Sequence, residues 1–195
     1  MEEGGHTAIV PSKRLVTNAK RKSEPKSSRK GEPSFFMSES MKRLSTPWSV
    51  ASIRARQIDP MALPAGVILD AAAGSGIQLI AFSKILKRPA LGVEIDQDVA
   101  KLCAANMYLN SEGDVQRSLD RVLVGDGCSA ESAVSTYWSS LREAGTRAHP
   151  PVAMLHIDPA RPRDAQNHSL DEMEPDIKSV LKGWSSHLQT GPKGP

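Results

Sequence analysis

The chain has 195 residues, of which 39% are hydrophobic and 24% charged, with a formal net charge of +3. This length suits one domain with a sizeable buried core, and no apolar run approaches the roughly 20 residues that a membrane-spanning helix needs. The N-terminus lacks the basic and then apolar order of a secretory signal. The two cysteines form neither a CxxC pair nor a disulfide framework, which favours a reducing, cytoplasmic location.

Positive charge is concentrated at the N-terminus. Residues 1–45 contain ten Lys or Arg and five Asp or Glu, whereas the rest of the chain contains 15 and 17. Because the apolar pattern fades after Val16, we predict that residues 1–38 form a disordered basic tail. Such a tail can attract the phosphates of RNA or DNA, or it can be a solvated segment without a partner. The sequence leaves both open.

Regular patterns begin after this tail. Residues 39–65 are predicted to be a helical lead-in, broken at Pro47. Apolar, β-branched runs then alternate with helical spacing, which predicts an α/β domain over residues 66–195 with a Rossmann-like, doubly wound, mostly parallel sheet. The expected strands cover residues 65–72, 90–96, 120–126 and 151–158. The expected helices cover residues 76–87, 97–110, 133–144 and 174–188.

Each predicted strand ends at or near an acidic residue. These residues are Asp70, Glu94, Asp126 and Asp158. Ligands of such sheets bind beyond the carboxyl ends of the strands, so the four side chains are expected to share a site. Acids can also end strands simply because loops are polar, but four at successive strands favour the shared site. A ligand with a positive centre, hydroxyls and amines would suit it, and S-adenosylmethionine has all three.

The turn after the first strand, AAAGSG at residues 71–76, consists of small residues that let the backbone approach a bound group closely. Glu94 follows Gly76 by 18 positions, close to the roughly 20 expected for an acid that accepts hydrogen bonds from a ribose. A nicotinamide dinucleotide would use the same arrangement. Its GxGxxG motif is absent, however, because Leu79 occupies the third position.

Four short segments together resemble a known family. ILDAAAGSG, GVEID, VGDGC and HIDPARP are similar to the motifs of class I S-adenosylmethionine-dependent methyltransferases. STPWSVASIRARQI and SLDEMEPDIKSVL resemble the members of that family that carry a THUMP-like domain, so the resemblance covers roughly residues 43–188. One departure is Ala72, which replaces the first glycine of the family's D-x-G-x-G-x-G motif.

The resemblance implies S-adenosyl-L-methionine as cofactor. The implied cofactor-binding residues are Asp70, Ala72, Gly74, Gly76, Glu94 and Asp126. Asp70 would lie near the methionine amino group, and the small residues would give the backbone close access. Glu94 would accept hydrogen bonds from both ribose hydroxyls. Asp126 would accept one from the adenine amine, with Gly127 leaving room for the ring. Asp70 or Asp126 could instead simply cap the segment that follows.

The segment DPAR is the implied catalytic part. Asp158 and the backbone after Pro159 would accept hydrogen bonds from a target NH₂, so that catalysis is mostly alignment and electrostatics. Arg161 stands where the family usually has an aromatic residue; an arginine can stack on a base, pair with a phosphate or contact the neighbouring helix. The resemblance therefore implies methylation of an RNA base amine. The alternatives are a methyltransferase of a small molecule or protein, and an inactive cofactor- or nucleic-acid-binding remnant.

Histidines and cysteines are given no catalytic or metal-binding role. His156 lies on an apolar run and is interpreted as a satisfied core histidine. The other histidines are scattered, and no metal-ligand spacing exists, so no metal site is predicted. Asn106 and Asn110 are assigned no role.

The family's sheet has seven strands in the order 3-2-1-4-5-7-6, of which four are found here. We therefore expect a truncated chain that lacks strands five to seven and any THUMP-like domain. Its fourth strand would be an apolar edge. A minimal domain that covers this edge by dimerisation is the alternative.

Overall fold

The computed structural model describes residues 5–38, 41–42, 45–111, 118–160 and 172–189. The strands are β1 (Thr7–Ile9), β2 (Val67–Asp70), β3 (Ala90–Glu94), β4 (Arg121–Val124) and β5 (Val152–His156). The helices are α1 (Lys13–Lys20), α3 (Trp48–Arg56), α4 (Ile77–Leu86), α5 (Gln97–Asn110), α6 (Ala130–Glu143) and α7 (Ile177–Trp184). The predicted alternation of strands and helices after residue 66 is confirmed. Within the described ranges, no helix is long and apolar enough to cross a membrane.

The five strands form one mostly parallel sheet with the order β1-β4-β3-β2-β5. β2 pairs in parallel with β3 on one side and with β5 on the other, and β3 pairs in parallel with β4. The chain therefore moves outward from β2 to β4 and then returns to the opposite side of β2. This reversal places a topological switch point between β2 and β5, where ligands of open α/β sheets bind.

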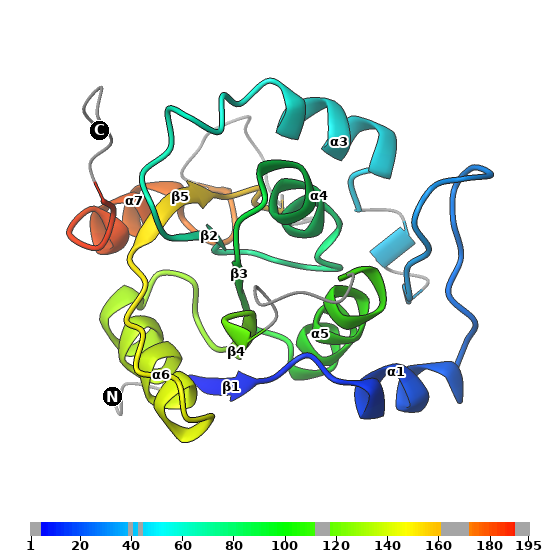
Figure 1. Cartoon of the computed structure of the whole chain (residues 1–195), viewed down its shortest axis with the longest axis horizontal. Coiled ribbons are helices and arrows are strands. Elements are labelled where there is room, and N and C mark those ends of the chain that lie inside the picture. The colour runs from blue at the N-terminus through cyan, green and yellow to red at the C-terminus, as the bar shows by residue number, and fades with distance from the viewer. Residues whose placement is uncertain (1–4, 39–40, 43–44, 112–117, 161–171, 190–195) are drawn as a thin grey trace.

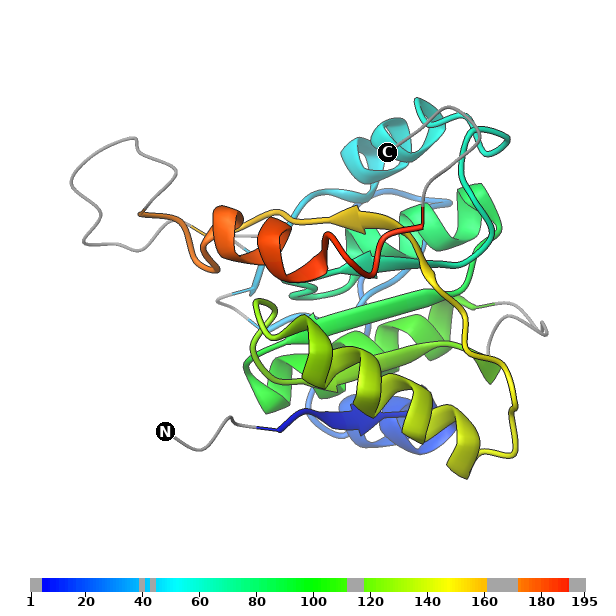
Figure 2. The same ribbon diagram turned by 90° about the vertical axis from the view of Figure 1, so that its left-hand side faces the viewer.

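Helices cover both faces of the sheet (Figures 1 and 2). α4 and α5 lie on one face, with α3 packed on α4 and α1 on α5. α6 and α7 contact each other and lie on the opposite face. Because both faces are covered, three of the parallel strands are almost entirely buried, which explains why their sequences are continuous apolar runs.

The prediction of four strands and a disordered N-terminal tail is corrected for residues 5–38. β1 pairs antiparallel with β4, with Thr7 opposite Val124, and it is followed by helix α1. The buried side chains of Phe35 and Phe36 then anchor the segment to the domain. A three-residue strand is too short to show a period, and α1 has only eight residues. Their stability comes from contacts with the domain rather than from local propensity.

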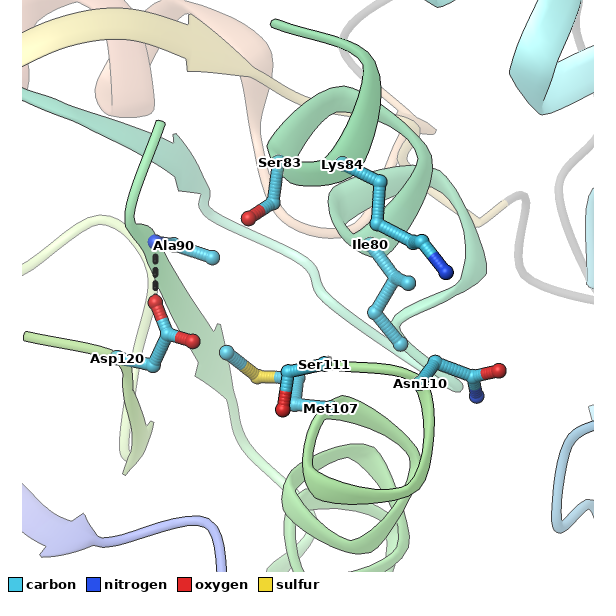
Figure 3. A pocket seen from close by; sticks show the side chains of 8 residues that line it. All are labelled: Ile80, Ser83, Lys84, Ala90, Met107, Asn110, Ser111 and Asp120. Atoms are coloured by element: carbon cyan, nitrogen blue, oxygen red, sulfur yellow. Dashed lines mark hydrogen bonds between the residues drawn. The ribbon is translucent and has the colours of Figure 1, made fainter. Parts of the chain in front are cut away.

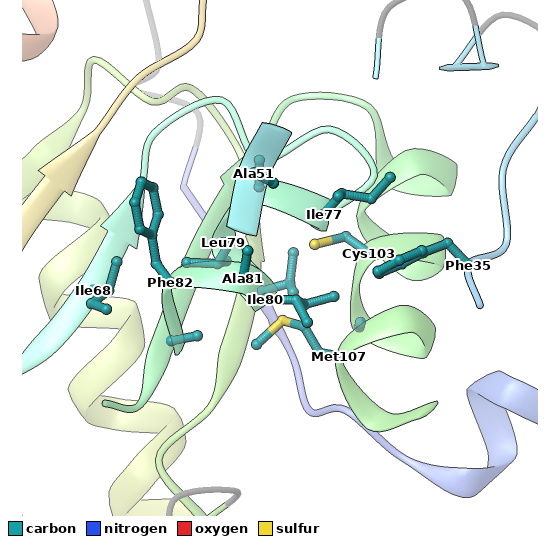
Figure 4. Close-up of a cluster of buried hydrophobic side chains, with 14 of the residues drawn as sticks. Phe35, Ala51, Ile68, Ile77, Leu79, Ile80, Ala81, Phe82, Cys103 and Met107 are labelled. Carbon is teal, nitrogen blue, oxygen red and sulfur yellow. The ribbon is translucent and has the colours of Figure 1, made fainter. Parts of the chain in front are cut away.

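The larger core cluster joins this N-terminal segment to the lead-in helix and to the sheet (Figure 4). Phe35 lies against Trp48 with ring centroids 5.8 Å apart, and both belong to the cluster formed around α4 and α5. Ala51 and Ala55 of α3 are fully buried in the same cluster, and their small side chains allow α3 to approach α4 closely. The lead-in is thus an integral part of the domain.

Specific residues fix the ends of two helices near the carboxyl edge of the sheet. The side chain of Asp96 accepts hydrogen bonds from the backbone N–H groups of Asp98 and Val99 and so caps α5. Gly76 adopts the left-handed conformation directly before α4, with φ +78°. Its tight turn lets the chain leave β2 and enter α4 within a few residues.

β5 is the last strand in the sheet order among the described residues. On its outer side, Leu188 makes one parallel bridge to Val152, and the backbone N–H of Gln189 donates to the Val152 carbonyl at 2.9 Å. The outer side of β5 is therefore paired at its first residue, Val152. Along the rest of that side, β5 has no neighbouring strand in the part of the chain that the structure describes.

Candidate functional site

The sheet brings the four predicted acids to its carboxyl edge. Asp70 and Glu94 are the last residues of β2 and β3. Asp126 and Asp158 each lie two positions after the end of β4 and β5. Asp158 follows β5 on one side of the switch point, and Asp70 ends β2 on the other. The side chains differ sharply in environment, and each is described separately below.

Asp70 has a buried carboxyl group with two partners. Its residue is 2% exposed. One carboxylate oxygen accepts from the Ala72 N–H at 3.1 Å, and the other lies 3.1 Å from Nδ1 of His156. Asp70 therefore holds the start of the turn after β2 and ties β2 to β5. His156 is a satisfied histidine, as predicted, but its partner was not foreseen because the register of the two strands is not visible in sequence.

The turn at residues 71–76 is held open by two glycines with positive φ. Gly74 has φ +50°, and a Cβ placed there would meet no atom within 4 Å. A Cβ at Gly76 would instead lie 2.7 Å from Sγ of Cys103. Gly76 therefore packs against α5, whereas Gly74 borders open space. Ala72 is half-buried between them and the strand.

Glu94 clamps this turn to the neighbouring strand. Its Oε2 accepts from the Gly74 N–H at 2.9 Å, and its Oε1 accepts from the Asp96 N–H at 3.0 Å. A carboxylate has about four lone-pair directions, so each oxygen retains one further acceptor position. Both of these free acceptor positions lie on the carboxylate that borders the open space at Gly74.

Cys103 of α5 lies beside this turn. Burial, together with the charges of Asp70 and Glu94, raises the pKa of the Cys103 thiol far above its ordinary value.

Asp126 begins a turn that packs against the first loop. Its Oδ1 accepts from the Cys128 N–H at 2.9 Å. A Cβ at Gly127 would overlap the Ala71 carbonyl oxygen. The space that the sequence reserves for an adenine ring at Gly127 is thus filled by the first loop. Partial burial, with Asp126 nearby, raises the pKa of Cys128 to about 11, so its thiol is protonated at neutral pH.

Asp158, like Asp126, is exposed. Its Oδ2 accepts from the Thr46 hydroxyl at 3.2 Å and lies 3.5 Å from Nη1 of Arg54. Arg54 also donates to Oε1 of Gln78 at 3.3 Å. The lead-in segment before and within α3 therefore forms a wall beside the carboxyl end of β5. Pro159 follows directly and is half-buried, and Arg161 lies outside the described residues.

Several residues at this edge were not identified from the sequence. The amide of Asn106 accepts from Phe36 N–H at 2.7 Å and donates to the carbonyls of Phe36 and Ser75, each at 2.9 Å. It connects the N-terminal segment to the glycine turn. Ser45 donates to the Ser75 hydroxyl at 3.0 Å. Polar residues on a helix usually face solvent, so only the burial of Asn106 reveals its role.

His6, directly before β1, supports the turn at Asp126. Its Nε2 lies 3.0 Å from the Asp126 carbonyl oxygen and its Nδ1 lies 3.0 Å from the Ser132 hydroxyl. A neutral ring that donates from Nε2 and accepts at Nδ1 satisfies both contacts. Burial lowers the pKa of His6, which favours that neutral ring. The ring also lies directly against Gly125, where a Cβ would overlap it.

A small pocket lies at the opposite, amino edge of the sheet (Figure 3). α4 and α5 line it with Ser83, Lys84 and Asn110, and Asp120 accepts from the Ala90 N–H at 2.8 Å on its sheet side. Its volume of about 20 Å³ is comparable with a water molecule. It is therefore no cofactor site. Within the described ranges, no group of three His, Cys, Asp or Glu side chains could hold a metal ion.

The site belongs to an α/β protein whose sheet carries acidic strand ends and a glycine turn at its switch point. Comparison with protein-family models, with curated proteins and with solved structures finds no match. The contacts described above are therefore the basis for the function proposed below.

Proposed function

We propose that this protein is an S-adenosylmethionine-dependent methyltransferase of the class I type. The observation that carries the proposal is the contact between Glu94 and Gly74. An anion at the end of β3 holds the open glycine turn after β2 while keeping acceptor capacity on both oxygens. This combination suits a ligand with a ribose whose remaining part lies along the turn. The resemblance of the motifs to methyltransferases agrees with it.

The residues at the edge can divide the ligand between them. Glu94 accepts hydrogen bonds from the ribose hydroxyls. Asp70 holds the start of the turn through its hydrogen bond from the Ala72 N–H, and its negative charge favours a cationic group over the turn. Asp126 accepts from the adenine amine at the far side of the turn. Because Gly127 is packed against Ala71, the adenine ring lies beside this turn rather than above Gly127.

The substrate side is assigned to Asp158 and Pro159, with an RNA base amine as the methyl acceptor. When bound, S-adenosylmethionine supplies an activated methyl group. Asp158 accepts a hydrogen bond from the target NH₂ and so orients its nitrogen lone pair. Arg54 and Thr46 hold the Asp158 carboxylate in place from the lead-in wall. The protein's contribution is alignment and charge rather than a strong base.

Calorimetric titration tests the cofactor assignment. S-Adenosylmethionine and S-adenosylhomocysteine should bind more tightly than NAD. Replacing Glu94 by Gln or Ala should weaken binding by about 2 kcal/mol, the scale of a lost hydrogen bond to a charged group. Glu143→Ala, at an exposed acid on the last position of α6, is the matched control and should leave the affinity unchanged. Equal affinity of the wild type and both Glu94 variants would contradict the proposal.

A further inference from the structure

The N-terminal segment presents a cationic surface in a fixed arrangement. Between Lys13 and Lys30 the only acid is Glu24. The basic residues, all exposed, are Lys13, Arg14, Lys20, Arg21, Lys22, Lys26, Arg29 and Lys30. We call these eight side chains the basic surface. They lie on α1 and on the loop after it, and the bridge between Lys26 and Phe35 fixes the far side of that loop.

The apolar side of α1 is already used inside the protein. Ala19 is buried in a small cluster with Phe36 and Ala105, and Leu15 and Val16 pack against it. The exposed large apolar residues lie elsewhere, and none falls within residues 13–30, all of which the structure describes. A helix that inserts into a membrane needs a free apolar face. The basic surface offers charge alone, which suits a hydrophilic polyanion.

The basic surface lies beside the edge that carries the candidate site. α1 packs on α5, whose first turn contains Asp98. Lys22 also contributes to lowering the pKa of the Asp98 carboxyl group, after the larger effect of Lys101. This turn follows Glu94 by only a few residues. On the other side, Lys26 lines a small pocket with Phe35 and Lys42, and Lys42 precedes the lead-in wall by a few positions.

We propose that the basic surface binds the sugar–phosphate backbone of a nucleic acid and leads the strand toward the carboxyl edge of the sheet. Every contact would be to phosphate, because the surface has charge and no exposed aromatic side chain for stacking between Lys13 and Lys30. Binding should therefore be independent of base sequence and should fall steeply with salt. Phosphate binding stands on the basic surface itself; only its link to methyl transfer rests on the proposed function.

The test is charge reversal of Lys20, Arg21 and Lys22 together to Glu in the full chain. Its matched control reverses Arg142, Arg147 and Lys182, which are exposed on or near α6 and α7. Both variants change the net charge equally, but the control residues lie across the sheet from α1. Binding of a fluorescein-labelled single-stranded RNA and of the same DNA sequence is measured by fluorescence anisotropy over a range of NaCl concentrations.

We expect the basic-surface variant to bind at least about tenfold more weakly at 50 mM NaCl, whereas the control changes less than about threefold. The magnitude of the slope of log affinity against log salt should fall by about 2, because three phosphate contacts are lost and each contributes roughly 0.7. A second variant carries Lys26→Ser, Arg29→Ser and Lys30→Ser in the loop and leaves α1 unchanged. It should also weaken nucleic-acid binding and reduce its salt dependence. The RNA and DNA arms show which backbone is preferred.

Equal loss in the basic-surface and control variants would mean that only net charge matters, and would overturn the proposal. Binding to vesicles rich in phosphatidylserine without binding to either nucleic acid would overturn it in favour of a membrane surface. S-Adenosylmethionine titration separates this proposal from the proposed function. If the cofactor fails to bind while RNA binding follows the variants, the proposed function fails and the nucleic-acid surface stands. If the cofactor binds while RNA binding does not depend on the basic surface, the proposed function stands and the proposal for the basic surface fails.

Discussion

Nδ1 of His156 lies 3.1 Å from Oδ2 of Asp70, across the two parallel strands that flank the switch point. The two residues are direct partners in the strand register, and Asp70 is almost fully buried. The ring of His156 also meets Phe82 of α4 edge-on at 5.1 Å. One side chain therefore joins β5, β2 and α4 immediately beneath the candidate site.

Replacing His156 by Leu should destabilise the protein. The substitution leaves the buried Asp70 carboxyl group without one of its partners, which should cost about 1–3 kcal/mol, the scale of a buried acceptor left unsatisfied. Urea unfolding measures the loss. In a double-mutant cycle, adding Asp70→Asn should recover part of it, because a neutral amide is less costly to bury than an unpaired charge. Additive effects of the two substitutions would show that the contact contributes no coupling.

Protonation of His6 should lower the free energy of unfolding at mildly acidic pH. Burial lowers its pKa below the ordinary value of 6.5, so the unfolded chain binds the proton first as the pH drops. The free energy of unfolding then decreases from about pH 6.5 down to the folded-state pKa and is unaffected by this group above that window. Urea titrations at pH 7.5 and 5.5 should show a smaller decrease for His6→Asn than for the wild type. An identical decrease would contradict the role of His6.

The two glycines of the turn should respond differently to alanine. Gly76→Ala places a methyl group 2.7 Å from Sγ of Cys103 at positive φ, so it should cost more than the roughly 1–2 kcal/mol of the backbone conformation alone. Gly74→Ala meets no neighbour and should cost only that conformational amount. Because Gly74 borders the proposed cofactor site, Gly74→Ala should lower the free energy of cofactor binding more than it lowers the free energy of unfolding. Thermal unfolding and calorimetric titration of both variants compare the two effects.

Asn106→Ala should loosen the N-terminal segment from the glycine turn. It removes three hydrogen bonds at a fully buried position and leaves the Phe36 and Ser75 backbone groups without them, which should cost about 2–4 kcal/mol. Hydrogen exchange at the Phe36 amide should accelerate more than at amides of α6. Ser111→Ala, at the end of the same helix, is the control. Unchanged exchange at Phe36 would show that its burial alone protects it.

The sequence predicted the parallel strands because burial on both faces makes each a continuous apolar run, and it predicted the helices from their spacing. It missed β1 because three residues carry no period, and it missed the order of α1 because its stability depends on Phe36 and α5. The four acids were found because strand ends are visible in the pattern. Their partners, His156, Arg54, Thr46 and His6, were not, because pairing across the fold depends on register and packing.

The antiparallel strand at the edge has a consequence for how the chain assembles. His6 and Asp126 are 120 positions apart, and β1 cannot find its place until β4 exists. During synthesis at about 5–20 residues per second, the first residues therefore wait roughly 6–24 seconds for their neighbour. Until then β1 cannot pair, whereas α1 and the basic surface wait only for α5, on which α1 packs. The surface that we propose to bind nucleic acid would thus form only after α5 has been made, and the pairing of β1 would report that β4 is in place.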